Sequence, residues 1–227
     1  MTTGKRPRVV LIHALRDSLV PAWNAFAAGW PEALTYNLLD ESLSADLAAD
    51  EALTDGMVDR FLTLGKYAAA TGSRGERTDA ILFTCSAFGP AIMRVKERLS
   101  IPVLRPNEAA FEAAVDAGSR IGLVVTFSAS LHPLQAELEA VGDKRGKALT
   151  VTTAVAEGAL AALQAGRGDE HDRIVADTAA RLPHVEALVL GQFSLARAAK
   201  VIAPVEGRIV LTTPDSAVTR LRALLSA

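Results

Sequence analysis

Short runs rich in valine, isoleucine and leucine alternate along the chain with longer alanine-rich stretches of helical periodicity. Uninterrupted apolar runs are typical of parallel strands that helices cover on both faces. The pattern therefore predicts an α/β protein. Strands are expected at residues 8–13, 33–38, 80–84 and 101–104 in the first half of the chain, and at 121–125, 150–153, 187–190 and 208–211 in the second half.

The stretches between these strands have the composition of helices and exposed loops. Two segments rich in glycine and charge, 71–77 and 141–147, are interpreted as loops. We expect two pseudo-symmetric lobes, each a four-stranded parallel sheet flanked by helices, with residues 1–106 and 207–227 in the first lobe and 107–206 in the second. Helices are expected at 20–28, 50–70, 89–99, 108–117, 131–140, 160–165, 170–181, 195–200 and 216–225.

The two halves of the chain repeat each other in two places. The sequence PRVVLIHALRDSLVP at 7–21 aligns without gaps with SRIGLVVTFSASLHP at 119–133, and AILFTCSAFG at 80–89 aligns with ALVLGQFSLA at 187–196. Any two βα units share an apolar strand and a small-residue turn, which is the alternative explanation. The ungapped identities favour a duplication, and they place Gln192 where the first half has Cys85.

Composition and charge exclude several classes of protein. The chain has 227 residues, 50% of them hydrophobic and 22% charged, which is enough to bury a large core. A net charge of −2 without a basic stripe argues against nucleic acid as a partner. The N-terminus lacks the apolar run of a signal peptide, and no stretch reaches the ~18 apolar residues of a membrane span. With one cysteine and no internal disulfide, we expect a cytoplasmic protein that does not enter membranes.

No motif for a cofactor or a metal follows any of the strands. A glycine-rich phosphate loop and a dinucleotide fingerprint are both missing, so no cofactor is expected. The four histidines, His13, His132, His171 and His184, are too scattered in the sequence for a metal site. We expect His171 and His184 in solvent and His132 near the strand ends.

Cys85 is the main candidate for chemistry because it ends an expected strand and opens an expected helix. Ligands of open parallel sheets bind beyond the carboxyl ends of the strands. The unpaired N–H groups and the positive end of a helix favour a thiolate at this position. The alternative is that a free cysteine only fills space in the core.

These motifs resemble those of the aspartate/glutamate racemase superfamily, which includes hydantoin racemases, maleate isomerases and arylmalonate decarboxylases. The family's first motif matches Thr84, Cys85 and Ser86, and its second motif matches Val189–Gly191 but has Gln192 in place of a cysteine. The resemblance implies a cofactor-independent racemase or isomerase of a small carboxylate-bearing substrate, such as an amino acid or a derivative. It also implies a site between the two lobes, with Cys85 as the catalytic thiol, and a homodimer or higher homo-oligomer.

The missing second cysteine leaves other functions open. Racemisation by two bases needs a titratable group on each face of the substrate, and the amide of Gln192 has no titratable proton near neutral pH. A single thiol could instead protonate a carbanion after decarboxylation of a malonate-type substrate. A third possibility is a small-molecule binding protein that has lost catalysis.

Two further residues of the first half are candidates for the site. His13 ends the first strand, where a neutral imidazole could take the thiol proton or replace the missing cysteine as second acid or base. A histidine that is only hydrogen-bonded at a strand end is an equally good explanation. Arg16 could bind a carboxylate bidentately, although a solvated loop charge is the simpler interpretation.

Small polar residues at other strand ends could hold the carboxylate of a substrate through hydroxyl and backbone N–H groups. Each of them could equally cap a helix. The residues expected to bind substrate are Thr84, Ser86, Ala87, Thr126, Ser128, Gln192, Phe193 and Ser194, together with Arg16. Asn107 and Glu108 are interpreted as caps of the helix at 108–117.

Overall fold

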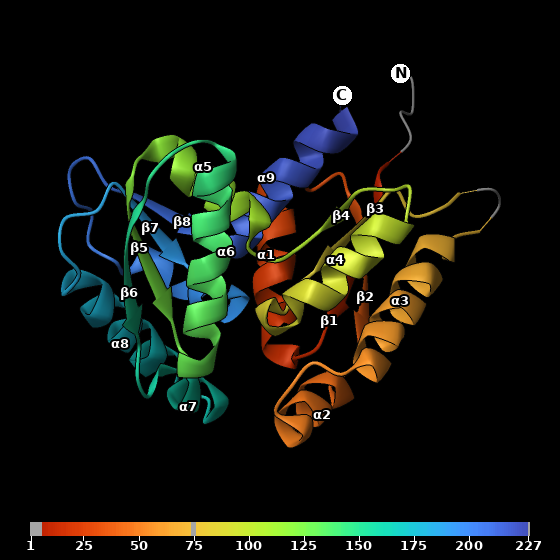
Figure 1. The fold of residues 1–227 in the computed structure, drawn as a ribbon, viewed down its shortest axis with the longest axis horizontal. Coiled ribbons are helices and arrows are strands. Elements are labelled where there is room, and N and C mark those ends of the chain that lie inside the picture. The colour runs from red at the N-terminus through yellow and green to blue at the C-terminus, as the bar shows by residue number, and fades with distance from the viewer. Residues whose placement is uncertain (1–5, 74–75, 227) are drawn as a thin grey trace. The chain divides into compact units, whose positions relative to one another are not determined.

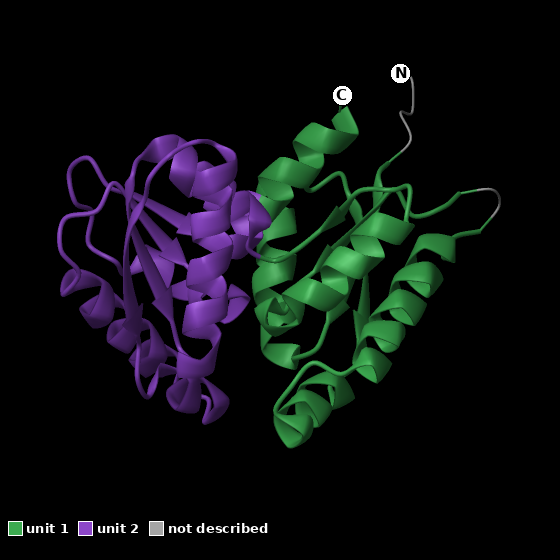
Figure 2. Cartoon of the chain, in the orientation of Figure 1, with its two compact units in different colours: residues 1–106, 217–227 green, residues 107–216 purple. Residues whose placement is uncertain are grey.

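The computed structural model describes residues 6–73 and 76–226 and divides the chain into two compact units (Figures 1 and 2). Unit 1 contains Met1–Pro106 and Ala217–Ala227, and unit 2 contains Asn107–Ser216. The first boundary lies where the sequence indicates it, but the second lies at residue 217 rather than 207. The reason is that the last strand pairs within the second sheet and only the terminal helix packs with the first unit.

Unit 1 is built on a parallel sheet whose strands lie in the order β2-β1-β3-β4. Helices α3 and α4 pack on one face of this sheet, and helix α1 lies on the other face (Figure 1). Side chains of β1 and β3 alternate between these two faces. The strands are β1 (Arg8–His13), β2 (Leu34–Leu39), β3 (Ala80–Phe83) and β4 (Val103–Leu104), and the helices are α1 (Leu19–Gly29), α2 (Ser42–Asp50), α3 (Asp55–Ala70) and α4 (Gly89–Arg98).

The core of unit 1 lies between its sheet and helices α3 and α4. Phe61 of α3 stacks on Phe83 of β3 with ring centroids 5.5 Å apart and contacts Phe88 at 4.8 Å. All three rings are buried, and fully burying one such side chain stabilises a fold by about 1.5–3 kcal/mol. Phe88 ends a short 3-10 turn, η2 (Ser86–Phe88), that directly precedes α4. This aromatic cluster therefore fixes the path of the chain immediately after β3.

Unit 2 repeats the architecture with the strand order β6-β5-β7-β8, again parallel throughout. Apolar clusters cover both faces of this sheet. The strands are β5 (Arg120–Val125), β6 (Thr150–Val155), β7 (Ala187–Leu190) and β8 (Ile209–Thr212); the helical elements are α5 (Glu108–Ala117), η3 (Ser128–Ser130), α6 (Leu131–Lys144), α7 (Ala159–Gln164), α8 (Gly168–Ala180) and η4 (Phe193–Lys200). The terminal helix α9 (Thr213–Ser226) begins in unit 2, and from Ala217 onward it belongs to unit 1.

The sequence repeats coincide with repeated structure. A shift of 112 residues brings β1, the turn η1 (Arg16–Ser18) and the start of α1 onto β5, η3 and the start of α6. A shift of 107 residues brings β3 onto β7 and the first residue of η2 onto the first residue of η4. The same connections at the same spacing in both sheets support the predicted duplication.

The structure corrects three of the expected elements. The stretch expected as one helix over 50–70 holds the end of α2, a break and α3, because Glu51 is left-handed (φ 53°) and Thr54 caps α3 by accepting from the Met57 N–H. Helix α6 continues to Lys144, into the segment 141–147 that was expected as a loop. The element at 193–200 is a 3-10 helix. The expected loop at 71–77 lies partly outside the described residues.

Across residues 6–73 and 76–226, none of the helices has both the length and the apolar character that crossing a membrane requires.

Candidate active site at the strand ends

Cys85 lies where β3 gives way to a helical segment. It has extended backbone angles (φ −112°, ψ 118°) and occupies the capping position of η2, which continues into α4. The backbone N–H of Ala87 donates a hydrogen bond to its sulfur. The thiol is half-buried and packs against the apolar cluster between the sheet and helices α3 and α4.

The protonation of Cys85 differs from the sequence-based expectation. Burial raises the pKa of the thiol above its ordinary value of 9.0, and the Ala87 N–H only partly opposes that effect. The start of the helical segment was expected to favour the thiolate, but desolvation of the sulfur is the larger effect. The resting group at neutral pH is therefore a protonated thiol, which can donate a proton before it can accept one.

His13 lies at the end of the neighbouring strand but points to the other face of the sheet. Side chains alternate along β3, so Thr84 projects to the face covered by α1, whereas Cys85 projects to the face covered by α3 and α4. His13 contacts Thr84 through Nδ1 at 2.9 Å. The sheet therefore separates the imidazole from the thiol, and His13 reaches Cys85 only through Thr84.

The imidazole of His13 is completely buried and joins its own strand, β1, to three other elements of unit 1. Its Nδ1 lies 2.8 Å from Ser18 Oγ and 2.9 Å from Thr84 Oγ1, and its Nε2 lies 3.0 Å from Asn37 Oδ1. Ser18 Oγ and Thr84 Oγ1 are themselves 2.9 Å apart. These contacts connect the end of β1 with β2, with the turn before α1 and with the end of β3.

The partners of His13 assign its tautomer. Nε2 faces the carbonyl oxygen of Asn37, so Nε2 carries the proton and Nδ1 accepts one. Ser18 donates its hydroxyl proton to the Leu15 carbonyl at 2.8 Å, which leaves the Thr84 hydroxyl as the donor to Nδ1. Burial lowers the pKa of His13 below its ordinary value of 6.5, and the hydrogen bond to Asn37 opposes this only in part. His13 is neutral at neutral pH.

The other candidates of unit 1 lie in more ordinary surroundings. Ser86 is half-buried and Ala87 is exposed, and both contribute backbone N–H groups to the first turn after Cys85. Arg16 is exposed and pairs bidentately with Glu41, at 2.7 and 2.5 Å, so its guanidinium already has a carboxylate partner. Exposed pairs of this kind contribute little to stability.

In unit 2, Gln192 follows β7 as Cys85 follows β3. Its Oε1 accepts hydrogen bonds from the backbone N–H of Thr126 at 2.7 Å and from the Thr126 hydroxyl at 2.8 Å. Thr126 corresponds in the repeat to Ala14, which has no hydroxyl. The strand end of unit 2 therefore presents an anchored amide where unit 1 presents a thiol.

The remaining candidates of unit 2 divide into exposed and buried side chains. Ser128 is exposed and Ser194 is half-buried, but the Phe193 ring is buried at 3% exposure. Asn107 does not cap α5 with its side chain, contrary to the sequence-based interpretation. Its Nδ2 donates to the Gly191 carbonyl at 3.2 Å, because the side chain turns toward the end of β7 instead of toward its own helix.

The structure corrects the expected exposure of one histidine. His132 and His184 are exposed, but His171 is completely buried in α8, with Nδ1 2.7 Å from Asp172 Oδ1. Arg197 of η4 donates to the same Asp172 oxygen at 2.7 Å. No group of three or more histidine, cysteine, aspartate or glutamate side chains within the described ranges is arranged to hold a metal ion.

Sequence reasoning missed two partners of His13, namely Ser18 and Asn37. A signal for Ser18 was present in the sequence, because the repeat aligns it with Ser130. In the structure, each of these two hydroxyls donates to the carbonyl of the residue three positions earlier. The signal for Asn37 was weaker: it is an amide inside the otherwise mostly apolar strand β2.

Comparison with solved structures identifies proteins of the same fold. Allantoin racemase from Pseudomonas fluorescens is 16% identical with a TM-score of 0.65, over 96% of this chain and 91% of that chain. Aspartate racemase from Picrophilus torridus is 13% identical with a TM-score of 0.68, over 97% and 94%. Glutamate racemase from Francisella tularensis, solved with D-glutamate, is 14% identical with a TM-score of 0.68, over 97% and 81%.

These likenesses establish the fold of two four-stranded parallel sheets flanked by helices. No curated protein matches the sequence significantly. A family model described as Asp/Glu/Hydantoin racemase, however, matches residues 27–221, a range that includes every strand from β2 to β8. The chain thus belongs to the Asp/Glu/hydantoin racemase family, and its function is of the racemase or isomerase type.

Proposed function

We propose that this protein is a cofactor-independent racemase or isomerase that moves a proton at a carbon next to a carboxylate in a small substrate, with Cys85 as the catalytic thiol. The observation that carries the proposal is the position of the chain's one cysteine. It ends a central strand of its sheet, it opens a helical segment, and its sulfur accepts the Ala87 N–H.

The surroundings of Cys85 suit transfer of a proton to carbon. Burial holds the thiol in its protonated form, so Sγ–H is available as an acid. The backbone N–H groups of the first turn after Cys85 can stabilise negative charge that develops on a substrate carboxylate or on the sulfur. The Thr84 hydroxyl, which is hydrogen-bonded to His13, fixes the strand end that carries the thiol.

A decarboxylase of malonate-type substrates is the second candidate, and the identity of residue 192 favours it. An amide cannot take a proton from carbon, whereas decarboxylation needs no such base. The bond between the carboxylate and the α-carbon breaks, carbon dioxide leaves and its electron pair remains on the α-carbon. Cys85 then transfers its Sγ proton to that carbon, and the thiolate recovers a proton from water. One thiol supplies the whole of this chemistry.

Exchange of the α-proton in deuterated water, followed by NMR, tests the proposal. The wild type and Cys85→Ser are each incubated with amino acids, hydantoins and substituted malonates. Deuterium incorporation that depends on Cys85, accompanied by loss of optical activity, supports a racemase. Incorporation with release of carbon dioxide, giving one enantiomer, supports the decarboxylase.

A matched variant separates loss of chemistry from loss of fold. Ser100→Ala removes a similar-sized polar group from an exposed position before β4, at the opposite end of the strands from Cys85, and should keep the exchange rate. If Cys85→Ser keeps its circular dichroism spectrum and exchanges as fast as the wild type, the proposal is wrong. Saturable binding of a panel compound without any exchange would instead support a binding protein that has lost catalysis.

A further inference from the structure

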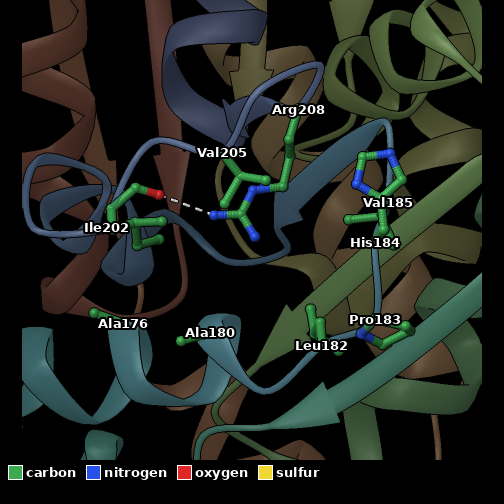
Figure 3. Close-up of a pocket in the computed structure, with 10 residues that line it drawn as sticks. Ala176, Ala180, Leu182, Pro183, His184, Val185, Ile202, Val205 and Arg208 are labelled. Carbon is green, nitrogen blue, oxygen red and sulfur yellow. Dashed lines mark hydrogen bonds between the residues drawn. The ribbon is translucent and has the colours of Figure 1, made fainter.

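Unit 2 contains a pocket of about 310 Å³ that belongs to none of the strand ends described above (Figure 3). Its walls come from the second half of α8, from the chain that leads into β7 and from the chain that leads into β8. All of its lining residues lie between Ala176 and Arg208, within unit 2. The volume is at the lower end of the range of small-molecule sites, roughly 300–1,000 Å³.

The pocket lies at the amino-terminal ends of β7 and β8, whereas Gln192 lies at the carboxyl-terminal end of β7. Val185 precedes the first residue of β7, and Arg208 precedes the first residue of β8. Gln192 follows the last residue of β7. A four-residue strand is about 13 Å long, so the length of the sheet separates the pocket from the strand end that carries Gln192.

The walls of the pocket are mainly apolar. Leu182 and Val185 line one side, and Ile202 and Val205 line the side across from them (Figure 3). Val205 is 41% exposed, so part of its side chain is open to solvent and available to a ligand. Alanines of α8 form the floor, where larger side chains would fill the space.

One cation, the guanidinium of Arg208, points into this apolar space (Figure 3). A tight turn holds the residue in place: the Arg208 N–H donates to the Val205 carbonyl at 3.1 Å, and Gly207 takes the left-handed conformation (φ 71°). One terminal nitrogen donates to the Ala203 carbonyl at 3.0 Å. The Nε atom is buried and has no hydrogen-bond partner.

Within the part of the chain that the structure describes, Arg208 has no carboxylate partner. Glu186, on the segment beside it, is committed elsewhere: its carboxylate accepts the backbone N–H groups of Ser119 and Arg120 at 2.8 and 2.9 Å. A guanidinium with a buried, unsatisfied N–H is costly for a fold to retain. An anion that enters the pocket would supply a counter-charge to the guanidinium as a whole.

We propose that this pocket binds a small amphipathic carboxylate, with the hydrocarbon body between Val205 and Leu182 and the carboxylate on Arg208. Apolar walls and one guanidinium without a carboxylate partner among the described residues are complementary to such a ligand, and an arginine fork matches the geometry of a carboxylate. The site is separate from Cys85 and independent of the proposed reaction.

Titration of the full-length protein with hexanoate tests the proposal, with methyl NMR as the readout. We expect saturable shifts at the methyl groups of Leu182, Val185, Ile202 and Val205. Arg208→Met, which keeps the aliphatic stem, should weaken binding roughly ten- to hundredfold, as the loss of a charged hydrogen-bonded pair predicts. Ala180→Leu, which narrows the pocket at α8 without touching Arg208, should also weaken binding.

Three controls keep the result specific to the pocket. Arg181→Met removes a neighbouring arginine that does not line the pocket and should leave binding unchanged. Cys85→Ser should bind hexanoate like the wild type, because the candidate active site is not involved. Hexanol and acetate supply the apolar body and the charge separately and should each bind more weakly. Equal binding of hexanol, shifts that map elsewhere, or full affinity in Arg208→Met would overturn the proposal.

Discussion

The Oε1 atom of Gln192 accepts two hydrogen bonds from Thr126, one from its backbone N–H and one from its hydroxyl. The equivalent positions in the other unit are Cys85 and Ala14. Both members of the pair therefore differ between the two halves. In unit 2, Gln192 is hydrogen-bonded to the end of the neighbouring strand. In unit 1, the corresponding residue of the neighbouring strand end is Ala14, whose side chain cannot form a hydrogen bond with the Cys85 thiol.

Replacing Gln192 with methionine should destabilise unit 2, because methionine keeps the length of the side chain but removes the acceptor. The Thr126 N–H would lose its acceptor. Because Thr126 is only 9% exposed, water could not easily replace that acceptor. A buried donor without a partner costs about 1–3 kcal/mol. Urea unfolding should show a loss of this size, and NMR should show faster amide hydrogen exchange at Thr126.

Gln192→Glu is the control for that prediction, because a carboxylate oxygen can still accept both hydrogen bonds. This variant should keep the exchange protection of Thr126 at neutral pH. Equal loss of protection in the methionine and glutamate variants would mean that the contact with Thr126 does not depend on an acceptor.

The burial of His13 predicts a pH dependence of stability. Its pKa in the folded protein lies below the ordinary 6.5, so the unfolded chain binds more protons between the two values. Stability from this group is complete above about pH 6.5 and is lost as the pH falls toward the folded pKa, by about 1.4 kcal/mol for each unit of difference. Urea unfolding measured from pH 7 to pH 5 should show this loss.

The comparison variant is His13→Gln, which is neutral at every pH. It should be less stable than the wild type at pH 7 but should lose less stability on acidification. If the free energy of unfolding falls equally with pH in the two proteins, the pH dependence belongs to groups other than His13.

Asn37→Asp should raise the pKa of His13, because it places a negative charge beside Nε2. The amide oxygen that it replaces lies 3.0 Å from that nitrogen, and an opposite charge at such a distance shifts a pKa by about 1–3 units. The imidazole carbon signals of His13, followed by NMR during a pH titration, measure the change. Asn37→Ser, which adds no charge, should leave the pKa of His13 on the low side, and an unshifted pKa in the aspartate variant would contradict the assigned contact.

The sequence predicted the strands and their duplication well because apolar runs and repeated turns are local signals. All eight expected strands exist, and β1 and β7 have the predicted bounds. The separation of His13 from Cys85 was harder to predict. Adjacent strand ends suggested proximity, but the face on which each side chain lies depends on the pairing of His13 with Thr84, one residue before the cysteine. The buried state of His171 depends likewise on packing around α8, which a charged stretch of sequence does not reveal.

Alkylation of Cys85 should be slow at neutral pH and should accelerate above it. Only the thiolate reacts with iodoacetamide, and burial raises the pKa of this thiol above 9.0, so little thiolate is present at pH 8. The chain has one cysteine, so mass spectrometry of the intact protein reports this site alone. We expect a rate at pH 8 at least about tenfold below that of the same chain unfolded in urea, rising with pH and without a plateau below pH 9. A plateau near neutral pH would show a stable thiolate, which would act as a base and not as the proton donor proposed above.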